Sequence, residues 1–191
     1  ITKWNLARFA ECLIPLIDKD QSNAIKIATE IINSFEKKYE EKWLNMMRDK
    51  LGLFGDEKND QSLILDLLTW MHEVKADYTN TFCYLMGEKI ELKKYYEDKR
   101  FLNWMERWKN RLKLNKNSSE KYLQLMKSVN PLVIPRNHKV EEVLESANQN
   151  NFQPLTKLIE ILSKPYLQNQ KIIEYQLPSN QKEKYQTFCG T

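Results

Sequence analysis

The sequence predicts an all-α fold, an irregular array of about eight helices followed by an extended C-terminal tail. Three observations lead to this prediction. The 191 residues include only four glycines, whereas average usage would give about 13, so tight turns are few. Apolar residues recur at helical spacing along most of the chain. No stretch alternates apolar and polar residues for long enough to predict a strand.

The first predicted helix runs from about residue 4 to residue 17, and Pro15 is expected to bend or shorten it because proline lacks a backbone N–H. The second runs from about Asn23 to Leu51. Gly52 follows at the position where a glycine commonly ends a helix in the left-handed conformation. These two helices account for the first quarter of the chain.

Two aspartates are predicted to cap the next two helices, because a carboxylate can accept hydrogen bonds from the free N–H groups of a first turn. Asp60 is the expected cap of a helix that ends near Lys75. Asp77 is the expected cap of a shorter helix that ends before Gly87.

The fifth predicted helix, residues 101–112, is strongly amphipathic, with Trp104 and Trp108 on its apolar face. Ser118 or Ser119 is the expected cap of the sixth helix. The Asn130-Pro131 pair is predicted to end that helix, because a proline disfavours helical geometry at the residue before it.

The seventh predicted helix starts near Asn137, and the eighth starts at Pro154 and ends before Pro165. From Tyr166 onward the sequence has no helical period and is rich in Gln, Asn and Lys. We therefore expect a helical region over residues 1–165 and an extended tail over residues 166–191 that wraps the surface or is partly mobile.

Positive charge is concentrated in residues 99–127, which contain nine Lys or Arg and two Glu, a net of +7. Such a stretch can bind a phosphate backbone or an acidic partner. The interpretation we favour is a solvated helix face. Trp104 and Trp108 could likewise stack on bases, but aromatic residues four positions apart are more often part of a core.

Several common site types are excluded by the sequence. It contains no GxGxxG and no GxxxxGK[ST] motif for holding a nucleotide. Cys12, Cys83 and Cys189 are too far apart to predict a zinc site or a disulfide framework, which indicates a reducing compartment. The apolar runs are too short to cross a membrane. Because the chain starts without a signal peptide or a methionine, we interpret it as a piece of a longer protein.

Few individual residues indicate a catalytic, binding or metal-ligating role. His72 is interpreted as a surface or boundary histidine without a carboxylate partner. His138, beside Arg136 and Asn137 at a predicted helix start, can cap the helix, order the loop or bind an anion, and a structural role is favoured. Paired acidic residues are not arranged as metal ligands. Cys189, third from the end, is an accessible thiol that can take part in redox chemistry.

Three segments have more specific sequences. They are Trp4-Asn5-Leu6-Ala7-Arg8-Phe9-Ala10-Glu11, the block from Val129 to Glu142 that contains Pro135-Arg136-Asn137-His138, and the end Tyr185-Gln186-Thr187-Phe188-Cys189-Gly190-Thr191. In order, they resemble the C-terminal part of the SelO (selenoprotein O) family. Ala76-Asp77-Tyr78-Thr79-Asn80-Thr81-Phe82 and Ser163-Lys164-Pro165-Tyr166 fit the same pattern.

The resemblance implies a pseudokinase-type enzyme that transfers AMP from ATP to protein hydroxyls with Mg²⁺ or Mn²⁺. The family's nucleotide and metal residues belong to a kinase-like core upstream of residue 1, so no catalytic, cofactor or metal residue is expected in this chain. The implied partners are that core and the protein substrates, without a membrane or nucleic acid. The implied compartment is the cytoplasm in a bacterium, or the mitochondrion in a eukaryote.

The resemblance also assigns residues. Cys189 matches a cysteine or selenocysteine linked to redox control, with a partner thiol upstream. The other motif residues are expected to be structural: Trp4, Asn5, Asn130, Pro131, Pro135, Arg136, Asn137 and His138. The leading hypothesis is a helical C-terminal region that supports and redox-regulates an adenylyltransferase core. The alternative is a freestanding helical module that binds nucleic acid or an acidic protein through residues 99–127.

Overall fold

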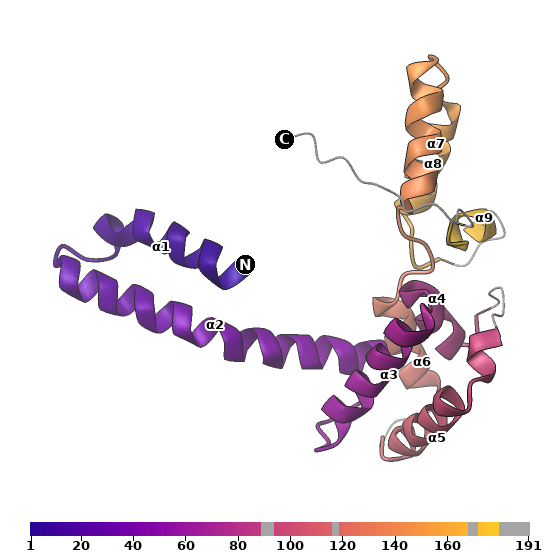
Figure 1. Ribbon diagram of the computed structural model, residues 1–191, viewed down its shortest axis with the longest axis horizontal. Helices are drawn as coiled ribbons and strands as arrows, with labels where there is room; N and C mark the ends of the chain where they lie inside the picture. Colours follow the sequence, from indigo (N-terminus) through magenta and orange to yellow (C-terminus); the bar gives the residue numbers. More distant parts are fainter. Residues whose placement is uncertain (89–93, 116–118, 168–171, 180–191) are drawn as a thin grey trace. The chain divides into compact units, whose positions relative to one another are not determined.

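The computed structural model describes residues 1–88, 94–115, 119–167 and 172–179. Within these ranges the secondary structure is helical and contains no strand, which confirms the predicted all-α class (Figure 1). The chain divides into two compact units, residues 1–47 and residues 48–191.

Residues 1–47 form a helical hairpin of α1 (Thr2–Ile17) and the greater part of α2 (Gln21–Lys50). Asp18 orders the turn between them, because its carboxylate accepts hydrogen bonds from Asn23 Nδ2 at 2.6 Å and from the Asp20 amide at 2.8 Å. Of the two effects expected of Pro15, bending or shortening of α1, shortening is not found. Pro15 lies in the last turn of α1, so it removes only one helical N–H donor and the helix continues to Ile17.

The second unit contains the end of α2 and the remaining helices. They are α3 (Asp60–Val74), α4 (Tyr78–Leu85), the 3₁₀ helix η1 (Lys94–Glu97), α5 (Lys99–Lys113), α6 (Ser119–Val129), α7 (Asn137–Asn148), α8 (Gln153–Leu162) and α9 (Ile173–Gln176). The α-helices through α8 start and end close to their predicted positions. Helix α5 packs on α3 and η1, and α7 packs on α8.

The sequence predicted no helix beyond Tyr166, and the structure differs there. Residues 173–176 form the single helical turn α9, in which Tyr175 and Gln176 are buried. The side-chain Nε2 of Gln176 donates to the Leu132 backbone carbonyl at 3.1 Å. The backbone carbonyl of Gln176 accepts from Asn80 Nδ2, also at 3.1 Å. These partners lie far away in sequence, so no local sequence pattern predicts this helical turn.

Aromatic rings form the core where α3, α4, η1 and α5 meet. Trp70 stacks on Phe101 with ring centroids 4.3 Å apart, and Tyr84 stacks on Tyr96 at the same separation. Phe101 also stacks on Trp104 at 5.9 Å. Because aromatic side chains bury large apolar areas, this cluster stabilises the packing of α5 against α3.

Gly52 ends α2 as predicted. Its φ of +69° lies in the left-handed region. The Leu53 amide donates to the Arg48 carbonyl at 2.9 Å and the Gly52 amide to the Asp49 carbonyl at 3.0 Å, which is the pairing of a Schellman motif. A Cβ placed on Gly52 would lie 3.1 Å from Met126 and Tyr122 of α6. The glycine therefore permits both the turn and the close approach of α6.

Replacing Gly52 with alanine is expected to lower the free energy of unfolding. The left-handed backbone costs an alanine about 1–2 kcal/mol, and overpacking against α6 adds about 1–3 kcal/mol. Gly55→Ala is the matched control, because Gly55 has a φ of +71° but no atom within 4 Å of its added Cβ. Urea unfolding measures both variants. Equal losses of stability would contradict the proposed contact with α6.

Candidate functional site

Asn130, in the block that resembles SelO, joins the ends of α2 and α6. It is 1% exposed. Its Oδ1 accepts from Lys50 Nζ at 2.9 Å, while its Nδ2 donates to the carbonyls of Lys50 and Met126, each at 2.9 Å. All of its described hydrogen bonds are internal, so its observed role is structural.

Lys50 is a half-buried cation that the sequence analysis missed. Besides Asn130, its ammonium group contacts two aromatic rings, with Nζ 4.9 Å from the Phe82 centroid and 5.6 Å from the Tyr78 centroid. Burial lowers the pKa of Lys50. A lysine at the end of a helix usually reaches solvent, and no sequence signal distinguishes this one.

Arg136 joins the start of α7 to the start of α4. Its Nη1 donates to Asp77 Oδ2 at 2.7 Å and its Nη2 donates to Asp77 Oδ1 at 3.0 Å. Asp77 also accepts from the Asn80 amide at 2.8 Å, which confirms it as the cap of α4. The buried Nε of Arg136 has no hydrogen-bond partner among the described residues. The two hydrogen bonds between Arg136 and Asp77 form a bidentate pair, which fixes both the distance and the orientation between the starts of α7 and α4.

The rest of the block has a simpler environment. Pro131 follows the end of α6 as predicted, and its carbonyl accepts from Cys83 Sγ at 3.8 Å. Pro135 and Asn137 are exposed. No side chain caps α7, so a capping role for His138 is not found. Burial and the charge of Lys139 lower the pKa of His138, which favours the neutral ring.

The remaining motif residues lie outside this block in the sequence. Trp4 and Asn5 lie on α1 in the other unit, where Trp4 is 64% exposed and its ring centroid lies 5.8 Å from the Arg8 guanidinium. Cys189 lies outside the described residues. Of the other cysteines, Cys12 is exposed, and burial raises the pKa of Cys83 to about 12, so its thiol stays protonated.

Arginines of the basic stretch are paired with carboxylates. Arg100 contacts Glu73 and Asp98, at 2.5 and 2.9 Å. Arg107 pairs with Asp66 at 2.7 Å, both of them half exposed. These carboxylates come from α3 and from the residue before α5. The pairing neutralises part of the positive charge that a nucleic acid would require.

The two tryptophans of the basic stretch belong to the core. Trp104 and Trp108 are 4% and 5% exposed. Their indole N–H groups donate to the Leu63 carbonyl at 2.7 Å and the Leu51 carbonyl at 2.9 Å. The interpretation of Trp104 and Trp108 as core residues is confirmed, because neither ring is free to stack on a base.

Asp60 is not the cap that the sequence predicted. The N-cap of α3 is Asn59, without a side-chain hydrogen bond. Asp60 is 0% exposed and accepts from Arg111 Nε at 2.6 Å and from Arg48 Nε at 2.8 Å. Burial acts to raise the pKa of Asp60, but hydrogen bonds from Arg111 and its other donors outweigh this, and the pKa is lowered. The carboxylate turns inward because two guanidinium groups lie there.

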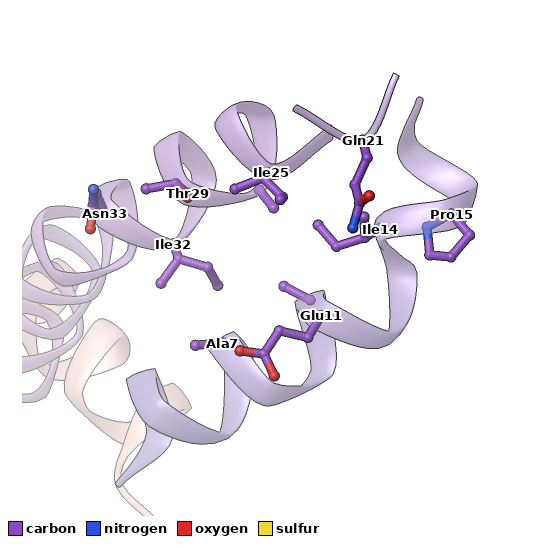
Figure 2. A pocket seen from close by; sticks show the side chains of 11 residues that line it. Ala7, Glu11, Ile14, Pro15, Gln21, Ile25, Thr29, Ile32 and Asn33 are labelled. Carbon is purple, nitrogen blue, oxygen red and sulfur yellow. The ribbon is translucent and has the colours of Figure 1, made fainter. Parts of the chain in front are cut away.

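A groove runs along the α1–α2 hairpin (Figure 2). It has a volume of about 610 Å³. Its lining residues are apolar or uncharged except for Glu11: Ala7, Ala10, Glu11, Ile14 and Pro15 from α1, and Gln21, Ile25, Ala28, Thr29, Ile32 and Asn33 from α2. In Figure 2 the side chains of Ile14, Ile25 and Ile32 lie around the space between the helices. The groove can therefore accept an apolar side chain or helix.

A divalent cation has no donor set among the described residues. There, no three His, Cys, Asp or Glu side chains lie close enough together to bind one metal ion. We assign no step of AMP transfer to these residues. Within the same ranges, no helix has both the length and the apolar character of a membrane span.

Comparison with known proteins decides the family. A family model described as "Protein adenylyltransferase SelO" matches residues 1–163. The chain belongs to the SelO family. This confirms the resemblance seen in the sequence, and it places the Asn130 and Arg136 block within the matched region.

Similar proteins in several bacteria are named "Protein nucleotidyltransferase YdiU". The one from Pelagibacter ubique is 54% identical over 100% of this chain and 40% of its own length. Those from Nitrosococcus oceani and Alcanivorax borkumensis are each 46% identical over 100% of this chain, and over 39% and 40% of their own lengths. The chain thus spans about two-fifths of the length of these SelO relatives.

Replacing Asp60 with asparagine is expected to lower the free energy of unfolding by about 3–5 kcal/mol, because the buried Arg111 guanidinium loses its countercharge and Arg48, which also pairs with the exposed Asp56, loses its buried partner. The folded-state pKa of Asp60 is lowered. Its stabilising contribution is therefore complete above the unfolded carboxyl pKa of about 3.9 and is lost as the pH falls through the lower folded-state value. Urea unfolding at pH 7 and at acidic pH measures both effects.

Asp66→Asn is the matched control, because Asp66 and Arg107 form an ion pair that is about half exposed. It should cost about 1 kcal/mol or less. The gap in stability between wild type and Asp60→Asn should narrow on acidification. A gap that stays constant with pH, or an equal cost for the two variants, would contradict the assigned role of Asp60.

Proposed function

We propose that this chain is the helical C-terminal part of a protein adenylyltransferase, an enzyme that transfers AMP from ATP to Ser, Thr or Tyr hydroxyls of proteins. The observation that supports this is the match over the whole chain to relatives named protein nucleotidyltransferase, which accounts for about two-fifths of their length. The nucleotide site, with its Mg²⁺ or Mn²⁺, lies in the part of the polypeptide outside this chain.

The role that we assign to the chain is to support that catalytic part. The polar groups of the SelO block point into the chain's own packing: Asn130 binds Lys50, and Arg136 binds Asp77. These contacts give the second unit a fixed shape. We do not adopt the alternative of a nucleic-acid or acidic-partner module, because Arg100, Arg107 and Arg111 are paired with carboxylates.

Transfer of labelled AMP tests the proposal. The test uses a fusion protein, called here the full-length protein. It joins this chain to the unmatched part of the 54% identical relative from Pelagibacter ubique. With ATP, Mg²⁺ or Mn²⁺ and a protein acceptor, the full-length protein is expected to label the acceptor, and the isolated chain is not. Calorimetry of the isolated chain with ATP and Mg²⁺ is the second measurement. Saturable binding at micromolar affinity, or labelling by the isolated chain, would refute the division of roles.

We further propose that Cys189 regulates the enzyme by forming a disulfide with a thiol outside this chain. In this step the two thiols lose two protons and two electrons to an added disulfide, such as oxidised glutathione, which is reduced to two thiols. The proposal rests on the match of the Phe-Cys-Gly-Thr end to the family pattern.

Cys189→Ser is expected to abolish the change in AMP transfer that oxidised glutathione causes in the full-length protein, because serine forms no disulfide. Cys12→Ser is the control, since Cys12 is an exposed cysteine outside the proposed pair. AMP transfer is measured before and after oxidation and after re-reduction. A redox response that persists in Cys189→Ser, or that disappears in Cys12→Ser, would refute this assignment.

A further inference from the structure

The α1–α2 hairpin has apolar side chains that its own two helices do not bury. Within residues 1–47, all of which the structure describes, the buried residues are Ala24, Ala28 and Met47. Large apolar residues of the same unit are about half exposed or more: Trp4, Phe9, Leu16, Ile25, Ile31, Tyr39 and Met46. Two helices alone rarely form a sufficient core, so such a hairpin needs another surface to pack on.

The groove in this hairpin has the composition of a helix-packing site. Small side chains, Ala7, Ala10 and Ala28, let a neighbour approach the backbone closely, while Ile25 and Ile32 offer apolar contacts (Figure 2). These positions recur at helical spacing on each helix, so the lining follows one continuous face. A ridge of side chains from another helix fits such a face.

The electrostatics of the groove also favour an apolar occupant. Glu11 is the charged residue of the lining, and it is paired with Arg8 one turn earlier. The other polar lining groups are the neutral side chains of Gln21, Thr29 and Asn33. A phosphate or a strongly charged peptide would find no complementary charge here, whereas an apolar helix would need none.

The comparisons point to a source for an apolar helix that packs in this groove, namely the rest of the SelO polypeptide. The 54% match covers the whole chain but only 40% of its SelO relative, so about three-fifths of that polypeptide lies outside the match. Resting on the function proposed above, we propose that the α1–α2 groove is the docking site for the catalytic part of the SelO polypeptide. An apolar helix of that part seats between Ile14 and Pro15 on one side and Ile25 and Ile32 on the other.

Hydrogen exchange measured by mass spectrometry tests this proposal. Peptides from residues 2–17 and 21–33 are expected to exchange at least tenfold more slowly in the full-length protein described above than in the isolated chain. Ile25→Glu should abolish this protection, because it places a charge in the groove at a residue that is 49% exposed in this chain. Ile159→Glu is the matched control, 58% exposed on α8 and outside the groove.

Thermal unfolding provides a second readout. Ile25→Glu should lower the midpoint of the full-length protein by several degrees and leave that of the isolated chain unchanged, whereas Ile159→Glu should leave both unchanged. Equal exchange in the two contexts would overturn the proposal. So would a loss of stability in the isolated Ile25→Glu chain, which would mean that the groove is filled by this chain itself.

A concentration-dependent dimer of the isolated chain that Ile25→Glu disrupts would also overturn it, by making a second copy the occupant. AMP transfer, measured on the same preparations, separates this proposal from the one it rests on. Transfer without protection of the hairpin would refute docking in the groove and leave the proposed function standing. Protection without transfer would refute the proposed function and leave the docking site standing.

Discussion

The second unit depends on one buried carboxylate. Asp60 lies between the guanidinium groups of Arg48 and Arg111 and so connects the end of α2, the start of α3 and the last turn of α5. Burying a charge is costly unless its partners are well placed, which makes the arrangement of these three segments specific. The stacked rings of Trp70, Phe101 and Trp104 lie on α3 and α5, so their contacts require the same arrangement.

The two units use their side chains in opposite ways. In residues 48–191 the polar groups of the SelO block turn inward, where Asn130 and Arg136 are bound by other parts of the same unit. In residues 1–47 many large apolar side chains are exposed, among them those of Trp4 and Ile25. The first arrangement stabilises a shape within the chain, and the second requires a surface beyond the hairpin.

Most helix limits could be predicted because they depend on neighbours in sequence. Gly52 ends α2 and Asp77 caps α4 through groups within a few residues. The inward turn of Asp60 could not be predicted, since its strongest partner, Arg111, is 51 residues away. Helix α9 was missed for the same reason. The helical periodicity of apolar residues identified the apolar faces of α1 and α2. Periodicity cannot show whether another part of the protein packs on such a face.

The bond between Asn130 and Pro131 has a consequence for chemical ageing. Asparagine side chains deamidate when the backbone nitrogen of the next residue attacks the side-chain amide and closes a five-membered imide. Pro131 has no backbone N–H to lose, so Asn130 lacks this route. Its amide both accepts from the Lys50 ammonium and donates to the Lys50 carbonyl. A buried contact that an aspartate could not reproduce is thus protected from deamidation through the imide.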